Sequence, residues 1–334
     1  MVSKIIKKKI LASSYIDKNR VKISPLALTE VADSYSKSSC AISIGIEHDI
    51  TIRPIGEILD MYIEEQTDGE VILYGDMELF SEPEIKIVAG EEYFYLRRGL
   101  SRRCFALGEK EDLEEFCIIL DSANLDEEKF VGEVLKIAEN TAFKIQTRSM
   151  IRRSAEPNPE IIMGIPIAIF QHILVYLALK IVDKKIEPMV NYVCETITIE
   201  NIKRFINAVL RIFNSNIKRD DRNISYIFKT TYKNVNVDFV YKNADEDVIV
   251  GSLMGIACAN ALKTIDDIGD RLGLQYIQFL YFEGSGSFRK NYMLTTKGEI
   301  IGTKLSEAIV SEQKKILEDV KLDASLGVRE KRKR

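Results

Sequence analysis

The sequence predicts an α+β protein built from two domains. Three observations support this. The chain has 334 residues, more than one average domain. Short strand-like runs between polar loops dominate residues 1–140, and helices mixed with hairpins dominate the second half. Apolar residues make up 46% and charged residues 29% of the chain, which excludes a disordered or collagen-like protein.

The first 140 residues are predicted to form mostly strands. Apolar runs and alternating patterns place these strands at residues 41–46, 58–64, 71–79, 92–96 and 116–120. The turn signal Thr67-Asp68-Gly69 joins the second and third of them into a hairpin. Residues 125–140 combine acids in their first turn with apolar residues near helical spacing, which predicts a helix.

One apolar segment, residues 161–182, is long enough to span a bilayer. Its middle contains Gln171 and His172, and such a pair is costly in lipid. We therefore expect a buried helix here, with Pro166 near the helix start, where its missing N–H does little harm. A membrane location is not expected.

The second half is predicted to be an α+β domain. Helices are expected at 196–216, 248–272 and 305–320, strands within 225–242, and a hairpin formed by 275–282 and 288–295. The predicted organisation is a β domain at 1–145, a linker at 146–160, the α+β domain at 161–326 and a basic tail at 327–334.

Charge and cysteine usage exclude several classes of protein. The net charge of −4 argues against a protein that coats nucleic acid, although the tail, with five basic residues and one acid, leaves nucleic acid as a partner of that segment alone. The five cysteines form no CxxC pair, and two histidines nearly exclude a His-rich metal site. We expect no cofactor, no metal and no signal peptide, and a cytoplasmic location.

The candidate catalytic residues are a histidine and a serine. His48 follows an apolar strand, and a histidine there can act as a general base because its pKa lies near neutrality. Ser101 lies in a glycine-marked, arginine-rich segment and is the candidate nucleophile, with Cys104 as a second candidate. Asp49 has an alternative role, orienting a neighbouring backbone turn.

The order of motifs over residues 22–140 resembles the prohead (capsid-maturation) serine proteases of tailed phages, which share a fold with herpesvirus assemblin. The matching segments, in chain order, are Pro25-Leu26-Ala27-Leu28, Ile44-Gly45-Ile46-Glu47-His48-Asp49, Pro54-Ile55-Gly56-Glu57-Ile58, Asp68-Gly69, Gly99-Leu100-Ser101, Asp112-Leu113-Glu114-Glu115-Phe116 and Ala123-Asn124. The resemblance implies a mostly antiparallel, β-barrel-like N-terminal domain with flanking helices.

The resemblance also implies a serine peptidase that acts on capsid-type or scaffold-type proteins or on itself, and that forms a homo-oligomer. Ser101 would attack the scissile carbonyl, and His48 would transfer the proton. Glu115 falls on the family's strand acid, and Asp121, which shares a strand face with it at period two, is the reserve.

The chain departs from the family pattern after Ser101. The family places a small residue and then Gly-Phe there, whereas Arg102, Arg103 and Cys104 precede Phe105 in this chain. A glycine lets backbone N–H groups approach an oxyanion. Without that glycine, this chain departs from the family in the segment that would form the oxyanion hole. The alternative function is therefore a catalytically inactive, protease-like recognition module that acts in phage sensing or host defence through its C-terminal domain.

Overall fold

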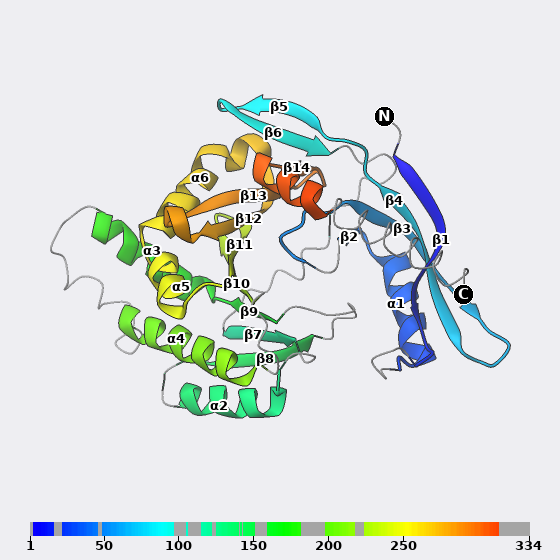
Figure 1. The fold of residues 1–334 in the computed structure, drawn as a ribbon, viewed down its shortest axis with the longest axis horizontal. Helices are drawn as coiled ribbons and strands as arrows, with labels where there is room; N and C mark the ends of the chain where they lie inside the picture. Colours follow the sequence, from blue (N-terminus) through cyan, green and yellow to red (C-terminus); the bar gives the residue numbers. More distant parts are fainter. Residues whose placement is uncertain are drawn as a thin grey trace, which may run out of the picture. The chain divides into compact units, whose positions relative to one another are not determined.

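Figure 1 shows a computed structural model of the chain. It describes residues 3–16, 22–45, 49–96, 105, 115–121, 125–139, 141, 143–150, 159–181, 198–217 and 224–313. The chain divides into two compact units: Met1–Glu109 with Tyr292–Arg334 forms the first unit, and Lys110–Asn291 forms the second. The sequence instead predicts a linker at 146–160 between domains at 1–145 and 161–326, and these domain boundaries stay a prediction.

The first unit contains a four-stranded antiparallel sheet in the order β1-β4-β3-β2. Its strands are β1 (Lys4–Ser13), β2 (Ile42–Ile44), β3 (Gly56–Glu65) and β4 (Val71–Leu79). The predicted hairpin is confirmed as β3 and β4, and Gly69 takes the positive φ of +78° that their connection requires. The predicted strand at 41–46 is confirmed as β2, whereas β1 was not predicted.

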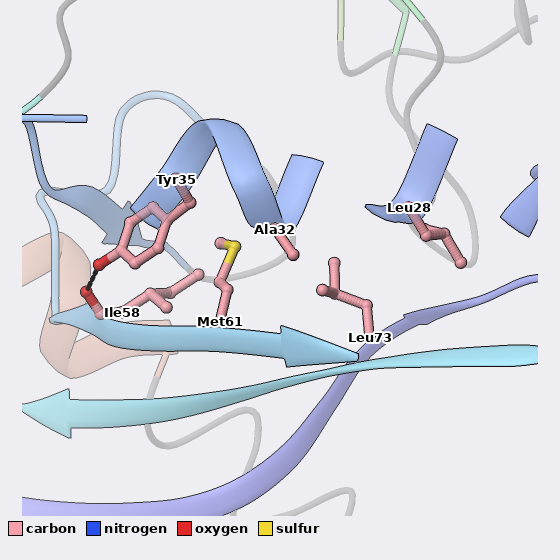
Figure 2. Packing of buried hydrophobic residues seen from close by; sticks show 6 residues of the cluster. All are labelled: Leu28, Ala32, Tyr35, Ile58, Met61 and Leu73. Atoms are coloured by element: carbon pink, nitrogen blue, oxygen red, sulfur yellow. Dashed lines mark hydrogen bonds between the residues drawn. The ribbon is translucent and has the colours of Figure 1, made fainter. Parts of the chain in front are cut away.

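Helix α1 (Pro25–Lys37) packs on this sheet. The Ser24 hydroxyl caps the helix by accepting a hydrogen bond from the Ala27 N–H at 3.1 Å, and Pro25 occupies the first turn. One helix face buries residues at helical spacing against apolar side chains of β3 and β4, as Figure 2 shows for Leu28, Ala32, Tyr35, Ile58, Met61 and Leu73. The Tyr35 hydroxyl donates to the Ile58 carbonyl, which fixes the helix against the strand.

The first unit also contains strands in the order β5-β6-β14-β13. Their bounds are β5 (Glu84–Val88), β6 (Glu91–Leu96), β13 (Ser287–Thr295) and β14 (Ile300–Gly302), and the division between the two units falls inside β13. The β5–β6 hairpin turns through Ala89 and Gly90, both at positive φ (52° and 82°). Residues 304–313 form a helix after β14, which overlaps the predicted helix 305–320.

The second unit is built on a mixed sheet in the order β12-β11-β10-β9-β7-β8. Three pairs, β7 with β8, β9 with β10 and β11 with β12, are parallel, whereas β7 with β9 and β10 with β11 are antiparallel. The strands are β7 (Phe116–Asp121), β8 (Ile145–Met150), β9 (Glu160–Gly164), β10 (Ser225–Tyr232), β11 (Val235–Lys242) and β12 (Leu274–Phe282). Strand β8 thus occupies part of the segment predicted as a linker.

The helices of the second unit contact one face of this sheet. They are α2 (Glu127–Glu139), α3 (Ile167–Ile181), α4 (Ile199–Asn216), α5 (Glu246–Leu253) and α6 (Ile256–Leu272). The contacting pairs are Phe170 with Phe239, Phe205 with Phe116, Phe213 with Tyr226, Ser252 with Tyr241, and Asp266 with Tyr232. Helix α2 joins this layer through Phe130, which packs on Phe213 of α4. We call this the helical face.

Two predicted helices are corrected. Residues 161–182 were expected to form one buried helix, but the segment forms β9 and then α3, separated by Ile165 and Pro166. A short apolar run has no periodicity that separates a buried strand from a buried helix. The predicted helix 248–272 is two helices, α5 and α6, because the chain breaks at Met254 and Gly255; a Cβ at Gly255 would lie 2.4 Å from the Gly251 carbonyl oxygen.

No single helix in the described part of the chain is long and apolar enough to cross a membrane. Helices α5 and α6 pass the length and composition test only as a pair, and their axes are bent by 45°.

The predicted α+β class is confirmed, but the expected barrel is not found among the described strands. Among the described strands of the sheet β1-β4-β3-β2, β1 pairs only with β4 and β2 pairs only with β3. A barrel requires the first and last strands to pair with each other, so this sheet is open.

Candidate functional site

The predicted catalytic residues are distributed over both units. His48 and Ser101 belong to the first unit and lie outside the described residues. Glu115 is described: it directly precedes β7 in the second unit and is half-buried. Asp121 ends β7, and its side chain lies outside the described part. The Ser-His-acid arrangement therefore stays a prediction.

The segment that follows His48 is held by its own hydrogen bonds. The Asp49 carboxylate accepts from the Thr51 N–H at 2.9 Å and from the Thr51 hydroxyl at 2.7 Å. This confirms the alternative role of Asp49, since an aspartate that binds the backbone two residues later forms a turn. The Ile55 N–H donates to the Ile44 carbonyl at 2.9 Å, so the chain leaves β2 and returns beside it.

An ion pair between a buried arginine and a half-buried glutamate fixes the same segment to the helix at 304–313. Arg53, only 4% exposed, places Nε 2.5 Å from Glu307 Oε1 and Nη2 2.7 Å from Oε2. The third guanidinium nitrogen donates to the Pro54 carbonyl at 3.2 Å. Such a bidentate pair fixes geometry as well as charge. Gly302 leaves room for it, because a Cβ there would lie 2.6 Å from Glu307 Oε1.

Two buried glutamates lie side by side near the start of β3. Glu57 and Glu78 are directly opposite each other in the β3–β4 ladder, and both are fully buried. No group of three or more metal-ligating side chains occurs in the described ranges. The pair is a feature that the sequence analysis did not identify.

The second unit contains a buried row of polar side chains at the centre of its sheet. Lys229 of β10 pairs with Asp238 of β11, and Asp238 pairs with Gln278 of β12. The row continues from Lys229 to Gly164 of β9 and Cys117 of β7. Strand neighbours in register share a face, and side chains alternate along each strand. Phe239 and Phe116, which contact helices, adjoin Asp238 and Cys117, so the row lies on the face opposite the helical face.

Hydrogen bonds connect this polar row. Lys229 Nζ and the Tyr276 hydroxyl both donate to Asp238 Oδ2, at 3.1 Å and 2.9 Å. Gln278 Nε2 donates to the Tyr276 hydroxyl oxygen at 3.1 Å, and Asn291 Nδ2 donates to Gln278 Oε1 at 2.7 Å. Asp238, Gln278 and Asn291 are at most 2% exposed, whereas the Lys229 side chain is 36% exposed. The buried members of the network therefore hold the partly exposed ammonium group of Lys229 in one orientation.

Comparison of the chain with protein-family models, with curated proteins and with solved structures finds no match.

Sequence reasoning missed the Arg53–Glu307 pair and the polar row for different reasons. The two members of the ion pair are 254 residues apart, and no local pattern links them. The polar row does leave a signal in the sequence. Asp238 lies between Val237 and Phe239, and Gln278 lies between Ile277 and Phe279. A polar residue flanked by apolar ones in a predicted core strand marks a position held by a network.

Proposed function

We propose that the protein is a serine peptidase similar to the prohead proteases, with Ser101 as nucleophile and His48 as general base. Its substrates are proteins of the capsid or scaffold type, or the chain itself. Glu115 is the first choice for the acid that orients the imidazole, and Asp121 is the reserve. The proposal includes a prohead-protease-like arrangement of residues 1–145.

The order of the elements carries this proposal. Strand β2 ends at Ile44, just before His48, and β3 begins at Gly56 within the Pro-Ile-Gly motif. Strand β4 follows the Asp68-Gly69 turn, β7 directly follows Glu115, and α2 begins after the Ala-Asn motif. The motifs of the resemblance that fall on described residues thus lie next to elements of the expected type. The exception is the motif at Pro25, which begins a helix.

The anchoring of residues 49–55 supports the proposal as well. A general base is effective only when its position is fixed by surrounding packing and hydrogen bonds. The residues that follow His48 are fixed by the Asp49 turn, by the Ile55 N–H bond to the Ile44 carbonyl, and by the ion pair of the buried Arg53 with Glu307.

The proposed reaction is acyl transfer to water. Ser101 Oγ forms a bond to the scissile carbonyl carbon while His48 takes its proton. The carbon–nitrogen bond then breaks, and His48 returns the proton to the leaving amine. Water attacks the resulting ester, His48 accepts the water proton and returns it to Ser101 Oγ, and the carboxylic acid product leaves.

Labelling with a biotinylated fluorophosphonate tests this function without a known substrate. We expect a single adduct that peptide mass spectrometry places on Ser101, and we expect its loss in Ser101→Ala. The matched control is Ser285→Ala, because Ser285 is an exposed serine outside the proposed site and its loss should leave labelling unchanged. A folded protein that takes up no label at Ser101 contradicts the proposal and favours the alternative, a non-catalytic recognition module.

A further inference from the structure

Strand β5 is an exposed edge strand of the first unit. It pairs with β6 on one side and is the terminal strand in the order β5-β6-β14-β13. Figure 1 shows the β5–β6 hairpin in cyan. Ile85 is 59% and Ile87 73% exposed, and these two isoleucines project from the same side of the strand. An edge strand with exposed apolar side chains is a template for pairing with another strand.

The opposite side of β5 carries charges of both signs. Glu84 and Lys86 alternate with the isoleucines and share the side of the hairpin on which Tyr95 and Tyr93 lie. Lys86 Nζ lies 4.2 Å from the centre of the Tyr95 ring, and this contact keeps the ammonium group on that side. The strand thus presents an apolar side and a charged side along one open edge.

We propose that β5 is a homodimer interface, in which β5 pairs antiparallel with β5 of a second copy about a two-fold axis at Ile85. The segment Glu84-Ile85-Lys86 is complementary to itself in this register. Glu84 of each copy faces Lys86 of the second copy, and Ile85 faces Ile85. Ile87 faces Pro83, which has no N–H to donate and so ends the ladder.

The charges select this register over its neighbour. A two-fold axis at Lys86 would place the two Lys86 side chains directly opposite each other, and like charges in that position are destabilising. A two-fold contact uses the same patch on both copies and closes at two chains, so it produces a dimer rather than a fibre. The paired strands are five residues long, so we expect a weak dimer whose population rises with protein concentration.

Sedimentation velocity of the full chain over a range of concentrations, with charge-reversed variants, tests the interface. We expect the wild type to dimerise reversibly. Glu84→Lys and Lys86→Glu should each weaken dimerisation about tenfold, because each replaces two attractive pairs by two repulsive ones. The double variant Glu84→Lys with Lys86→Glu restores the pairing with exchanged signs and should dimerise within about twofold of the wild type.

Ile85→Lys should abolish dimerisation, because it places two lysines opposite each other on the two-fold axis. Ile256→Lys is its matched control because Ile256 is equally exposed, at 59%, on α6 of the second unit. Circular dichroism checks that each variant is folded. A wild type that stays monomeric at every concentration overturns the proposal. Unchanged dimerisation in the single variants, or no recovery in the double variant, overturns it too. The readout is molecular mass, so it does not depend on peptidase activity.

Discussion

The sheet under α1 and the sheet of the second unit bury their cores with different side chains. The first is aliphatic: Leu28, Ile58, Met61 and Leu73 pack with a single aromatic ring, Tyr35. The second contains aliphatic side chains together with sets of contacting aromatic rings, and in one of these sets Phe239 contacts Phe170, Phe279 and Phe288. Aromatic side chains bury more surface and constrain one another's orientation. Removal of one ring from the second unit should therefore lower the free energy of unfolding more than removal of one aliphatic side chain from the first unit.

One surface network of the first unit and the polar row of the second unit also differ in their exposure to solvent. In the first unit, Asp68 and Glu70 bind Tyr15 and Lys22 at the solvent-exposed end of the β3–β4 hairpin. In the second unit, Asp238 and Gln278 lie in the middle of central strands and are buried. Water compensates for a bond lost at the surface but not for one lost in the interior, so equivalent substitutions should have unequal effects.

The largest expected effect is on the aromatic core. Phe239→Ala should lower the free energy of unfolding by about 4 kcal/mol, because the ring is fully buried and its centre lies 4.9 Å from that of Phe288. Leu73→Ala in the first unit should cost about 2 kcal/mol. Urea unfolding followed by circular dichroism measures both. A larger loss for Leu73→Ala would break the comparison between the two cores.

The buried polar row should give the next largest effect. Asp238→Ala removes the acceptor of the Tyr276 hydroxyl and should cost about 2 kcal/mol of unfolding free energy. Lys229→Ala removes a donor from the same oxygen, but its side chain is 36% exposed, so the cost should stay below about 1 kcal/mol. Equal losses measured by urea unfolding would show that burial does not govern this network.

A single buried hydrogen bond tests the packing of α1 on its sheet. Tyr35→Phe removes the bond from the Tyr35 hydroxyl to the Ile58 carbonyl and keeps the ring, so it should cost about 1 kcal/mol. The substitution removes only the hydroxyl oxygen and keeps the buried ring, so the lost hydrogen bond dominates the cost. An unchanged urea midpoint would mean that the apolar contacts alone hold the helix.

The smallest expected effect is the pH dependence of the surface network. The Glu70 N–H and the Tyr15 hydroxyl lower the pKa of Asp68, and Lys22 and the Ser14 hydroxyl lower the pKa of Glu70. Both folded pKa values lie below the unfolded ones, so this stability is present above an unfolded pKa of about 4 and is lost as pH falls through the folded pKa.

The matching measurement is the urea midpoint between pH 7 and pH 3 for Lys22→Met, with the exposed Lys263→Met as control. Lys22→Met should show a shallower fall in acid than the wild type, because the pKa of Glu70 returns toward its ordinary value. The control should follow the wild type. Equal slopes in all three proteins would assign the acid sensitivity to other carboxylates.

Much of the fold was predictable where local signals coincide. The β3–β4 hairpin, β7 and α2 all follow from alternation, a turn signal or acids in a first helical turn. Strand β1 was missed because its lysine-rich sequence becomes a strand only through pairing with β4. The start of α1 carries a helix signal in Ser24 and Pro25, but the same residues match a family motif that leads to a strand.

The candidate site was less predictable than the fold. Motif order singles out His48 and Ser101, and it contains no information about the contacts that fix their neighbours. Arg53 and Glu307 meet only after the helix at 304–313 packs on residues 52–55, through Ile52 and Val310. The hydrogen-bonded side chains of the polar row lie on four neighbouring strands, β10 to β13, and a shift of one strand by one residue would move its side chains to the helical face.

The most direct test of the proposed peptidase is the rate of fluorophosphonate incorporation at Ser101 in the wild type and in His48→Gln. A general base contributes about a hundredfold or more to such a step, so we expect the variant to react at least a hundredfold more slowly while it keeps the wild-type circular dichroism spectrum. Equal rates in the two proteins would contradict the assignment of His48 as the base that activates Ser101.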